Sequence, residues 1–216
     1  MELFGVPPEK ICVVGTGYSS RIFYDRDIRQ PHRETRLIYA GKISEKKGVY
    51  SLISALDLLG WRREDFSLRM AGGWGDEAQH EKALAAIEQS DWDITLLGRL
   101  PQDALAREYS MADVFILPSF YEGLPLVLAE ALACGARVVC TELPGIRPWM
   151  DGAAPGNGIV YVRPPRMTGP DTPLPEDLPA FEARLASAIR TAAALPIVGH
   201  DLTALSWTGV CNRILG

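Results

Sequence analysis

Short apolar runs alternate with segments of helical periodicity along most of this chain, and this alternation limits the possible folds more than any other feature. The runs that predict strands lie at 10–15, 35–41, 66–72, 93–98, 113–119, 136–141 and 158–165. The segments that predict helices lie at 47–60, 76–90, 101–112, 179–194 and from Pro125 onward. Repeated strand–helix units with short connections predict an α/β protein, with a parallel sheet covered by helices on both faces.

Two further segments complete this organisation. Residues 164–179 hold six prolines and are predicted to form a loop. Ser206 is placed to cap a last short helix at the end of the chain. Ligands of parallel sheets bind at the carboxyl ends of the strands. Here those ends read AGK, AGG, LGR, LPSFYEG and CTELPG, with glycine or polar residues where a ligand can approach the backbone.

Composition excludes several classes of protein. The net charge of −5 argues against a nucleic-acid-binding face, and no apolar run approaches the roughly 20 residues that span a bilayer. The start MELFGVPPEK does not resemble a signal peptide. Cys12, Cys134 and Cys140 lie in apolar runs, as expected for reduced core thiols of a cytoplasmic protein. The three histidines are far apart in sequence, so no metal site is expected.

The helix that begins at Pro125 contains an unexpected carboxylate. Glu130 lies within PLVLAEALA, where burial of an unpaired charge is costly unless a partner is bound. Helical side chains tilt toward the N-terminus, so Glu130 leans toward the end of the helix that attracts anions. Amides without an intrahelical acceptor are expected near Gly123, Leu124, Leu126 and Val127. A nucleotide offers diphosphate to such amides and ribose hydroxyls to the carboxylate.

Several motifs in a fixed order resemble those of a known family. They are GKISEKKG, AGGWGDE, ITLLGRLP, MADVFILPSFYEGLPLVLAEALACGARVVCTELPGI and LSW. Together they resemble the C-terminal, donor-binding domain of family-4 retaining glycosyltransferases of the GT-B fold, also described as glycosyl transferases group 1. The resemblance runs from about residue 10 to residue 207. It implies a Rossmann-like three-layer α/β/α sandwich that forms one half of a GT-B fold.

The resemblance assigns roles to residues that match the family's motifs. Glu122 is implied to face the donor sugar, and Glu130 to bind the nucleotide ribose. Lys42 and Lys47 are implied to hold the diphosphate and stabilise it as the leaving group. Position 42 is lysine where the family usually has arginine, so the charge is kept but the bidentate geometry is lost.

Backbone contacts to the donor nucleotide are implied at two further loops and at the start of the helix. The residues concerned are Gly41, Gly98, Arg99, Leu100, Gly123, Leu124, Pro125 and Leu126. The resemblance also implies hexosyl transfer from a nucleotide sugar such as a UDP or GDP sugar, with retention. The cations and the helix N-terminus stabilise the departing diphosphate without proton transfer. The resemblance implies that no metal is needed, and no cofactor is expected.

The resemblance also sets expectations for domains and partners. Residues 1–34 are expected to form the interdomain connection and a first strand, and residues 35–216 the nucleotide-sugar-binding domain. The acceptor-binding N-terminal domain is expected to be absent, so the acceptor would be bound by that missing domain. The chain alone is then expected to bind donor but transfer poorly. Neither nucleic-acid binding nor membrane contact is expected of these residues.

Alternatives stay open at this stage. One is a non-catalytic nucleotide-binding or scaffold module of the same fold, and others are a GT-B-type phosphorylase and a dehydrogenase. The dehydrogenase is disfavoured because GTGYSS at 15–20 lacks the third glycine of a dinucleotide loop. Two D-x-D triplets, at 25–27 and 91–93, match metal-dependent glycosyltransferases in letters only. The first lies in a charged linker and the second precedes a strand as a turn.

Overall fold

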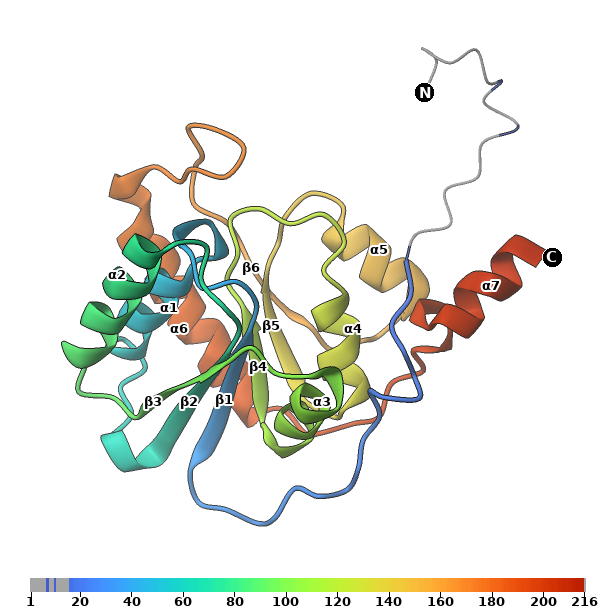
Figure 1. Cartoon of the computed structure of the whole chain (residues 1–216), viewed down its shortest axis with the longest axis horizontal. Helices are drawn as coiled ribbons and strands as arrows, with labels where there is room; N and C mark the ends of the chain where they lie inside the picture. The colour runs from blue at the N-terminus through green and yellow to red at the C-terminus, as the bar shows by residue number, and fades with distance from the viewer. Residues whose placement is uncertain (1–6, 8–9, 11–15, 216) are drawn as a thin grey trace.

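A parallel sheet with helices on both faces forms the body of the protein (Figure 1). The computed structural model describes residues 7, 10 and 16–215. The strand expected at 10–15 therefore lies outside the described residues except for Lys10, as does Cys12. All described strand pairs are parallel, in the order β3-β2-β1-β4-β5-β6. The strands are β1 Thr35–Ala40, β2 Phe66–Ala71, β3 Ile94–Gly98, β4 Val114–Leu117, β5 Arg137–Thr141 and β6 Val160–Val162.

The helices divide between the two faces of the sheet and bury a separate core on each. Helices α1 Val49–Leu56, α2 Glu77–Glu88 and α6 Leu178–Ala194 pack on one face. On the other face pack α3 Gln102–Met111, α4 Leu126–Ala133 and α5 Ile146–Ala153. Strands between two helical layers have no solvent-facing side, and all four residues of β4 are buried. The predicted Rossmann-like three-layer sandwich is therefore confirmed.

Short 3₁₀ turns and a last helix complete the described chain. They are η3 Glu45–Lys47, η4 Arg63–Asp65, η5 Pro175–Asp177, η6 Thr203–Leu205 and α7 Trp207–Leu215. Ser206 caps α7 as predicted, because its hydroxyl accepts a hydrogen bond from the Gly209 amide at 3.1 Å. Every helix in the described part of the chain falls short of the length and apolarity needed to cross a lipid bilayer.

Two helix starts and one missed helix differ from the prediction for local backbone reasons. The helix predicted at 47–60 starts only at Val49, because Gly48 takes a left-handed conformation with φ of 67° and separates it from η3. Pro125 caps α4 instead of forming its first turn, since its ψ of 96° is extended. Helix α5 was not predicted, and its Pro148 is tolerated because the first amides of a helix need no intrahelical acceptor.

The strand order reverses between β1 and β4. Strands β2 and β3 follow on one side of β1, whereas β5 and β6 follow on the other side of β4. The connections that leave the carboxyl ends of β1 and β4 therefore run to opposite sides, since α1 packs on one face of the sheet and α4 on the other. In open parallel sheets this reversal is where ligands bind.

Candidate functional site

The loops after β1 and β4 are joined across this reversal. The amide of Phe120 donates to the carbonyl of Lys46 at 2.9 Å. Gly48 lies directly against Pro118, and a Cβ at position 48 would stand 2.0 Å from the Pro118 carbonyl oxygen. Only glycine combines this close approach with the left-handed backbone. The two loops are thus held as one unit, with Lys47 facing the β4–α4 loop.

Lys47 and Glu122 form an ion pair at the centre of this unit. Their Nζ and Oε1 atoms are 2.8 Å apart, and the two side chains are 20% and 12% exposed. Lys47 also donates to the carbonyl of Tyr121 at 3.3 Å. The hydroxyl of Ser119 donates to Glu122 at 2.7 Å. Glu122 is therefore a fixed carboxylate and not a solvated loop residue, and Ser119 is a site residue that the sequence analysis missed.

Glu130 lies on α4, eight positions beyond Glu122, in a different environment. It is 9% exposed, and no hydrogen bond or ion pair to its carboxylate occurs among residues 16–215. Burial alone raises the pKa of Glu130 to about 7. The fully buried Tyr109 of α3 is a close neighbour, and its hydroxyl has no hydrogen-bond partner in the described structure. Burial and then the charge of Glu130 raise the pKa of Tyr109.

The start of α4 presents backbone to open space. A Cβ at Gly123 would meet no atom within 4 Å, and Leu124 is 40% exposed. Leu126 is the first residue of the helix, directly after the cap at Pro125. The amides of this first turn have no intrahelical acceptor, and the helix dipole adds positive potential there. An anion can therefore approach this helix end closely.

Glycines let the carboxyl ends of β1, β2 and β3 approach one another. A Cβ at Gly72, where φ is 144°, would stand 1.7 Å from the carbonyl oxygen of Gly41. The amide of Gly72 donates to the carbonyl of Gly98 at 2.8 Å. The side chain of Arg99 lies against Gly73, and that of Lys42 lies against Gly75. The structure thus brings Gly41, Lys42, Gly98 and Arg99 to the same edge of the sheet as Lys47.

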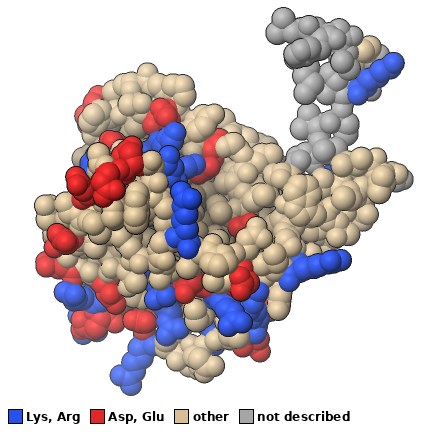
Figure 2. Space-filling model, viewed as in Figure 1, with Lys and Arg blue, Asp and Glu red and all other residues tan. Residues whose placement is uncertain are grey.

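The charges at this edge are visible on the surface. Figure 2 shows basic side chains in a line at the upper middle of the molecule, beside a hollow and near acidic side chains over the start of α2. Neither Lys42 nor Lys46 has an ion-pair or hydrogen-bond partner for its ammonium group within the described residues. Leu100, by contrast, packs partly buried against the core.

Trp74 and the first D-x-D triplet make contacts within the protein. The ring of Trp74 stacks on His80, with centroids 3.6 Å apart, and its backbone bridges to Ile43. In the first triplet the Asp27 amide donates to the Asp25 carboxylate, as in a turn. No group of three or more potential metal-binding side chains occurs among the described residues.

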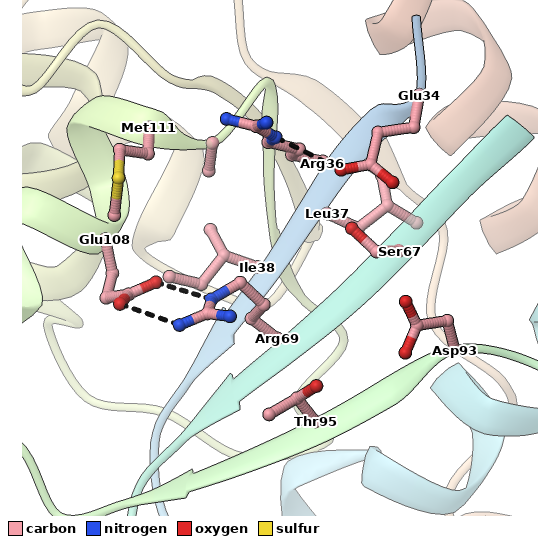
Figure 3. Close-up of a pocket in the computed structure, with 11 residues that line it drawn as sticks. Glu34, Arg36, Leu37, Ile38, Ser67, Arg69, Asp93, Thr95, Glu108 and Met111 are labelled. Atoms are coloured by element: carbon pink, nitrogen blue, oxygen red, sulfur yellow. Dashed lines mark hydrogen bonds and ion pairs between the residues drawn. The ribbon is translucent and has the colours of Figure 1, made fainter. Parts of the chain in front are cut away.

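Another hollow, of about 400 Å³, lies at the opposite end of the sheet (Figure 3). It opens over the amino-terminal halves of β1, β2 and β3 beside α3. Arg69 forms two hydrogen bonds with Glu108, at 2.7 and 2.9 Å, and Arg36 pairs with Glu34 at 3.3 Å. Both arginines of this hollow are therefore already engaged by protein carboxylates.

The chain is similar to known proteins in sequence. The sequence profile described as "Glycosyl transferases group 1" matches residues 20–164, a shorter stretch than the predicted 10–207. The chain is 34% identical over 149 residues to the amylovoran biosynthesis glycosyltransferase AmsK of Erwinia amylovora, covering 66% of this chain and 36% of that protein. It is 32% identical over 152 residues to the putative colanic acid biosynthesis glycosyltransferase WcaL of Salmonella typhimurium, covering 68% of this chain and 37% of that protein.

A solved structure gives the same fold. Anabaena Alr3699/HepE, determined in complex with UDP and glucose, superposes with a TM-score of 0.65 at 16% identity. The match covers 99% of this chain and 58% of that protein. The chain thus corresponds to about half of that GT-B structure and to little more than a third of the two sequence relatives.

Proposed function

The chain belongs to the glycosyl transferases group 1 family, and from this we propose that it binds the nucleotide-sugar donor of a retaining glycosyltransferase. The observation that carries the proposal is the pair of carboxylates around the start of α4. Glu122 is fixed by Lys47, and Glu130 is buried without a protein partner. A group that can donate hydrogen bonds to Glu130 would remove the cost of its burial.

A nucleoside diphosphate sugar fits these groups in one arrangement. The ribose hydroxyls donate to Glu130, and the diphosphate lies between the first amides of α4 and the ammonium groups of Lys42 and Lys47. The base lies near Gly98, Arg99 and Leu100. Because HepE was determined in complex with UDP, uridine is the first nucleoside to test.

The proposed chemistry follows from where charge develops. Breaking the bond between sugar and phosphate places negative charge on the departing diphosphate and positive character on the anomeric carbon. Lys42, Lys47 and the α4 terminus stabilise the first charge in place, without proton transfer. Glu122, held by Lys47 and Ser119, positions the sugar. No residue of this chain is assigned to the acceptor in this step, which is why we propose that the described domain alone transfers poorly.

Thermal unfolding with UDP, GDP, ADP and CMP, each with and without EDTA, tests the donor site. A ligand at about 100 times its dissociation constant adds roughly 2.7 kcal/mol, a shift of several degrees at this chain length. We expect a shift with one base that EDTA leaves unchanged. The absence of a shift with all four nucleotides, in this chain and in a version carrying an acceptor domain, would refute the donor site.

The same preparation tests the low transfer activity. Release of the free nucleotide from the matching nucleotide sugar is measured with this chain alone. We expect binding without turnover. Turnover by the chain alone would show that these residues suffice for the chemistry.

A further inference from the structure

A side cavity of about 450 Å³ lies next to the candidate site, on the α1 and α2 side of Lys42. One wall is the β1–α1 loop, with Lys42, Ser44 and Lys46. The opposite wall is the proline-rich segment 164–179, with Asp171 and Pro173. A volume of this size lies in the range of roughly 300–1,000 Å³ that small-molecule pockets occupy.

The wall formed by 164–179 is an ordered structure and not a free loop. Arg166 and Asp177 close its base with two hydrogen bonds of 2.8 Å between their side chains. The amide of Leu174 donates to the carbonyl of Arg166 at 2.8 Å, and that of Thr168 to the carbonyl of Thr172 at 2.9 Å. These bonds hold Asp171 and Thr172 at the side cavity.

Polar groups that the protein does not satisfy line the side cavity. The ammonium groups of Lys42 and Lys46 have no partner among the described residues. Ser44 is 6% exposed, and its hydroxyl has no hydrogen-bond partner among those residues either. Gln79 accepts a hydrogen bond from the Glu45 amide at 3.3 Å through its side-chain oxygen, which leaves its N–H groups as donors.

The charges and apolar faces that line the side cavity indicate which kind of ligand would fit it. Two lysines and the three acids Glu45, Asp76 and Asp171 line the side cavity, so its charge does not favour an anion. No aromatic ring of the described residues lines it, which argues against a nucleobase. Interleaved donors and acceptors beside the apolar faces of Pro173 and Pro175 suit a ring that carries many hydroxyls.

We propose that the side cavity is a saccharide-binding site, separate from the donor nucleotide site. Hydroxyl groups of the sugar donate to Asp171 and accept from Lys46, while ring C–H groups face Pro173. The position of this site rests on the proposed function: Lys42 lines the side cavity and is also placed at the proposed diphosphate position, so the saccharide would lie beside the donor.

Saturation-transfer NMR with methyl glycosides and disaccharides of common hexoses tests this site on the chain as it stands. We expect at least one saccharide to bind. Asp171→Ala and Lys46→Ala should each weaken it about tenfold or more, the effect of losing a hydrogen bond to a charged group. Neither residue is placed at the nucleotide site, so nucleotide affinity should be unchanged in both variants, which also shows that they are folded.

Glu176→Ala is the matched control, because it removes a carboxylate from the same segment but outside the side cavity. It should leave saccharide binding unchanged. The proposal is overturned if no saccharide binds while a nucleotide does, if binding survives both variants, or if inorganic phosphate competes for the same site. Saccharide binding without any nucleotide binding by this chain would support the side cavity, and the donor site would then be judged on the version that carries an acceptor domain.

Discussion

The two ends of the sheet handle a buried carboxylate in opposite ways. At the amino end, Asp113 is 7% exposed and accepts hydrogen bonds from His32 Nε2 at 2.7 Å and the Arg36 amide at 2.8 Å. Arg137 pairs with its other oxygen at 3.4 Å. At the carboxyl end, Glu130 is buried to a similar degree with no such partner among the described residues.

This difference distinguishes a carboxylate that stabilises the fold, Asp113, from one whose hydrogen-bond partner is expected to be a ligand, Glu130. A satisfied buried carboxylate can be part of the scaffold, because its partners replace the water that it loses. An unsatisfied one costs stability in the unliganded protein. Removing the carboxylate of Asp113 should therefore destabilise the fold, whereas removing that of Glu130 should weaken ligand binding without destabilising the fold. The following predictions test this difference.

The largest expected effect is on stability, from removing the paired carboxylate of Asp113 at the amino end of the sheet. Asp113→Ala leaves Arg137 and His32 without their carboxylate and should lower the free energy of unfolding by roughly 3–5 kcal/mol, measured by urea denaturation. Asp93→Ala, at the same end but exposed, is the control and should stay within about 0.5 kcal/mol of the parent. A small effect of Asp113→Ala would mean that the amino end is not a stabilising network.

The next largest effect is the pH dependence of protein stability that Glu130 contributes at the carboxyl end of the sheet. The pKa of Glu130 is raised from 4.5 to about 7, so the folded state binds its proton more tightly than the unfolded state. Stability from this group is complete below pH 4.5 and is lost as pH rises through about 7. The loss amounts to up to about 3 kcal/mol.

Glu130→Gln isolates this contribution, because glutamine does not titrate. Relative to the variant, the parent should become less stable between about pH 5 and about pH 8, measured by denaturation at each pH. Parallel stability profiles for the two proteins would contradict the raised pKa.

A smaller effect concerns the nucleotide affinity that Glu130 contributes. Glu130→Gln should weaken binding of the preferred nucleotide by about 1–3 kcal/mol, because a charged hydrogen bond to ribose is lost. Titration calorimetry at about pH 8, where the parent carboxylate is ionised, measures this. Glu34→Gln makes the same change at the opposite end and should leave affinity unaltered. Equal affinity of Glu130→Gln and parent would remove Glu130 from the site.

The smallest expected effect is that of a charge-conserving change at Lys42, and Lys42→Ala serves as its comparison. Lys42→Arg keeps the charge and adds a planar fork, so nucleoside diphosphate affinity should change by less than about 1 kcal/mol. Lys42→Ala should cost about 1.5–3 kcal/mol of the same affinity. Stability should be the same in both, since the Lys42 ammonium has no partner among the described residues. Similar binding losses in the two variants would show that more than charge is read at position 42.

Much of the fold could be predicted because its signals are local. Short apolar runs located β1 to β5 to within one or two residues, and those of β1, β2 and β3 end in glycine. Helix α5 was missed because Pro148 and Gly152 mask its periodicity. The predicted strand at 158–165 shortens to Val160–Val162, with Gly158 in a left-handed conformation before it. The boundary of the domain at residues 34 and 35 stays a prediction.

The candidate site could be predicted where its residues lie close together in one sequence motif. Glu122 and Glu130 belong to a single loop–helix unit, so their proximity follows from sequence. The side cavity could not be predicted from the sequence. Its two walls, the β1–α1 loop and segment 164–179, are far apart in sequence and are brought together only by the tertiary fold between β6 and α6. The group around Asp113 was missed for the same reason, since His32 lies 81 positions away.

The Arg166–Asp177 pair has a consequence for protein engineering. The two ends of this segment are joined to each other at its base, while Met167 between them packs against the core on the α1 and α6 face. We expect this segment to be exchangeable for that of a relative when the Arg–Asp pair and an apolar residue at position 167 are kept. Transplantation at these two positions would change one wall of the side cavity and leave the loops after β1 and β4 untouched.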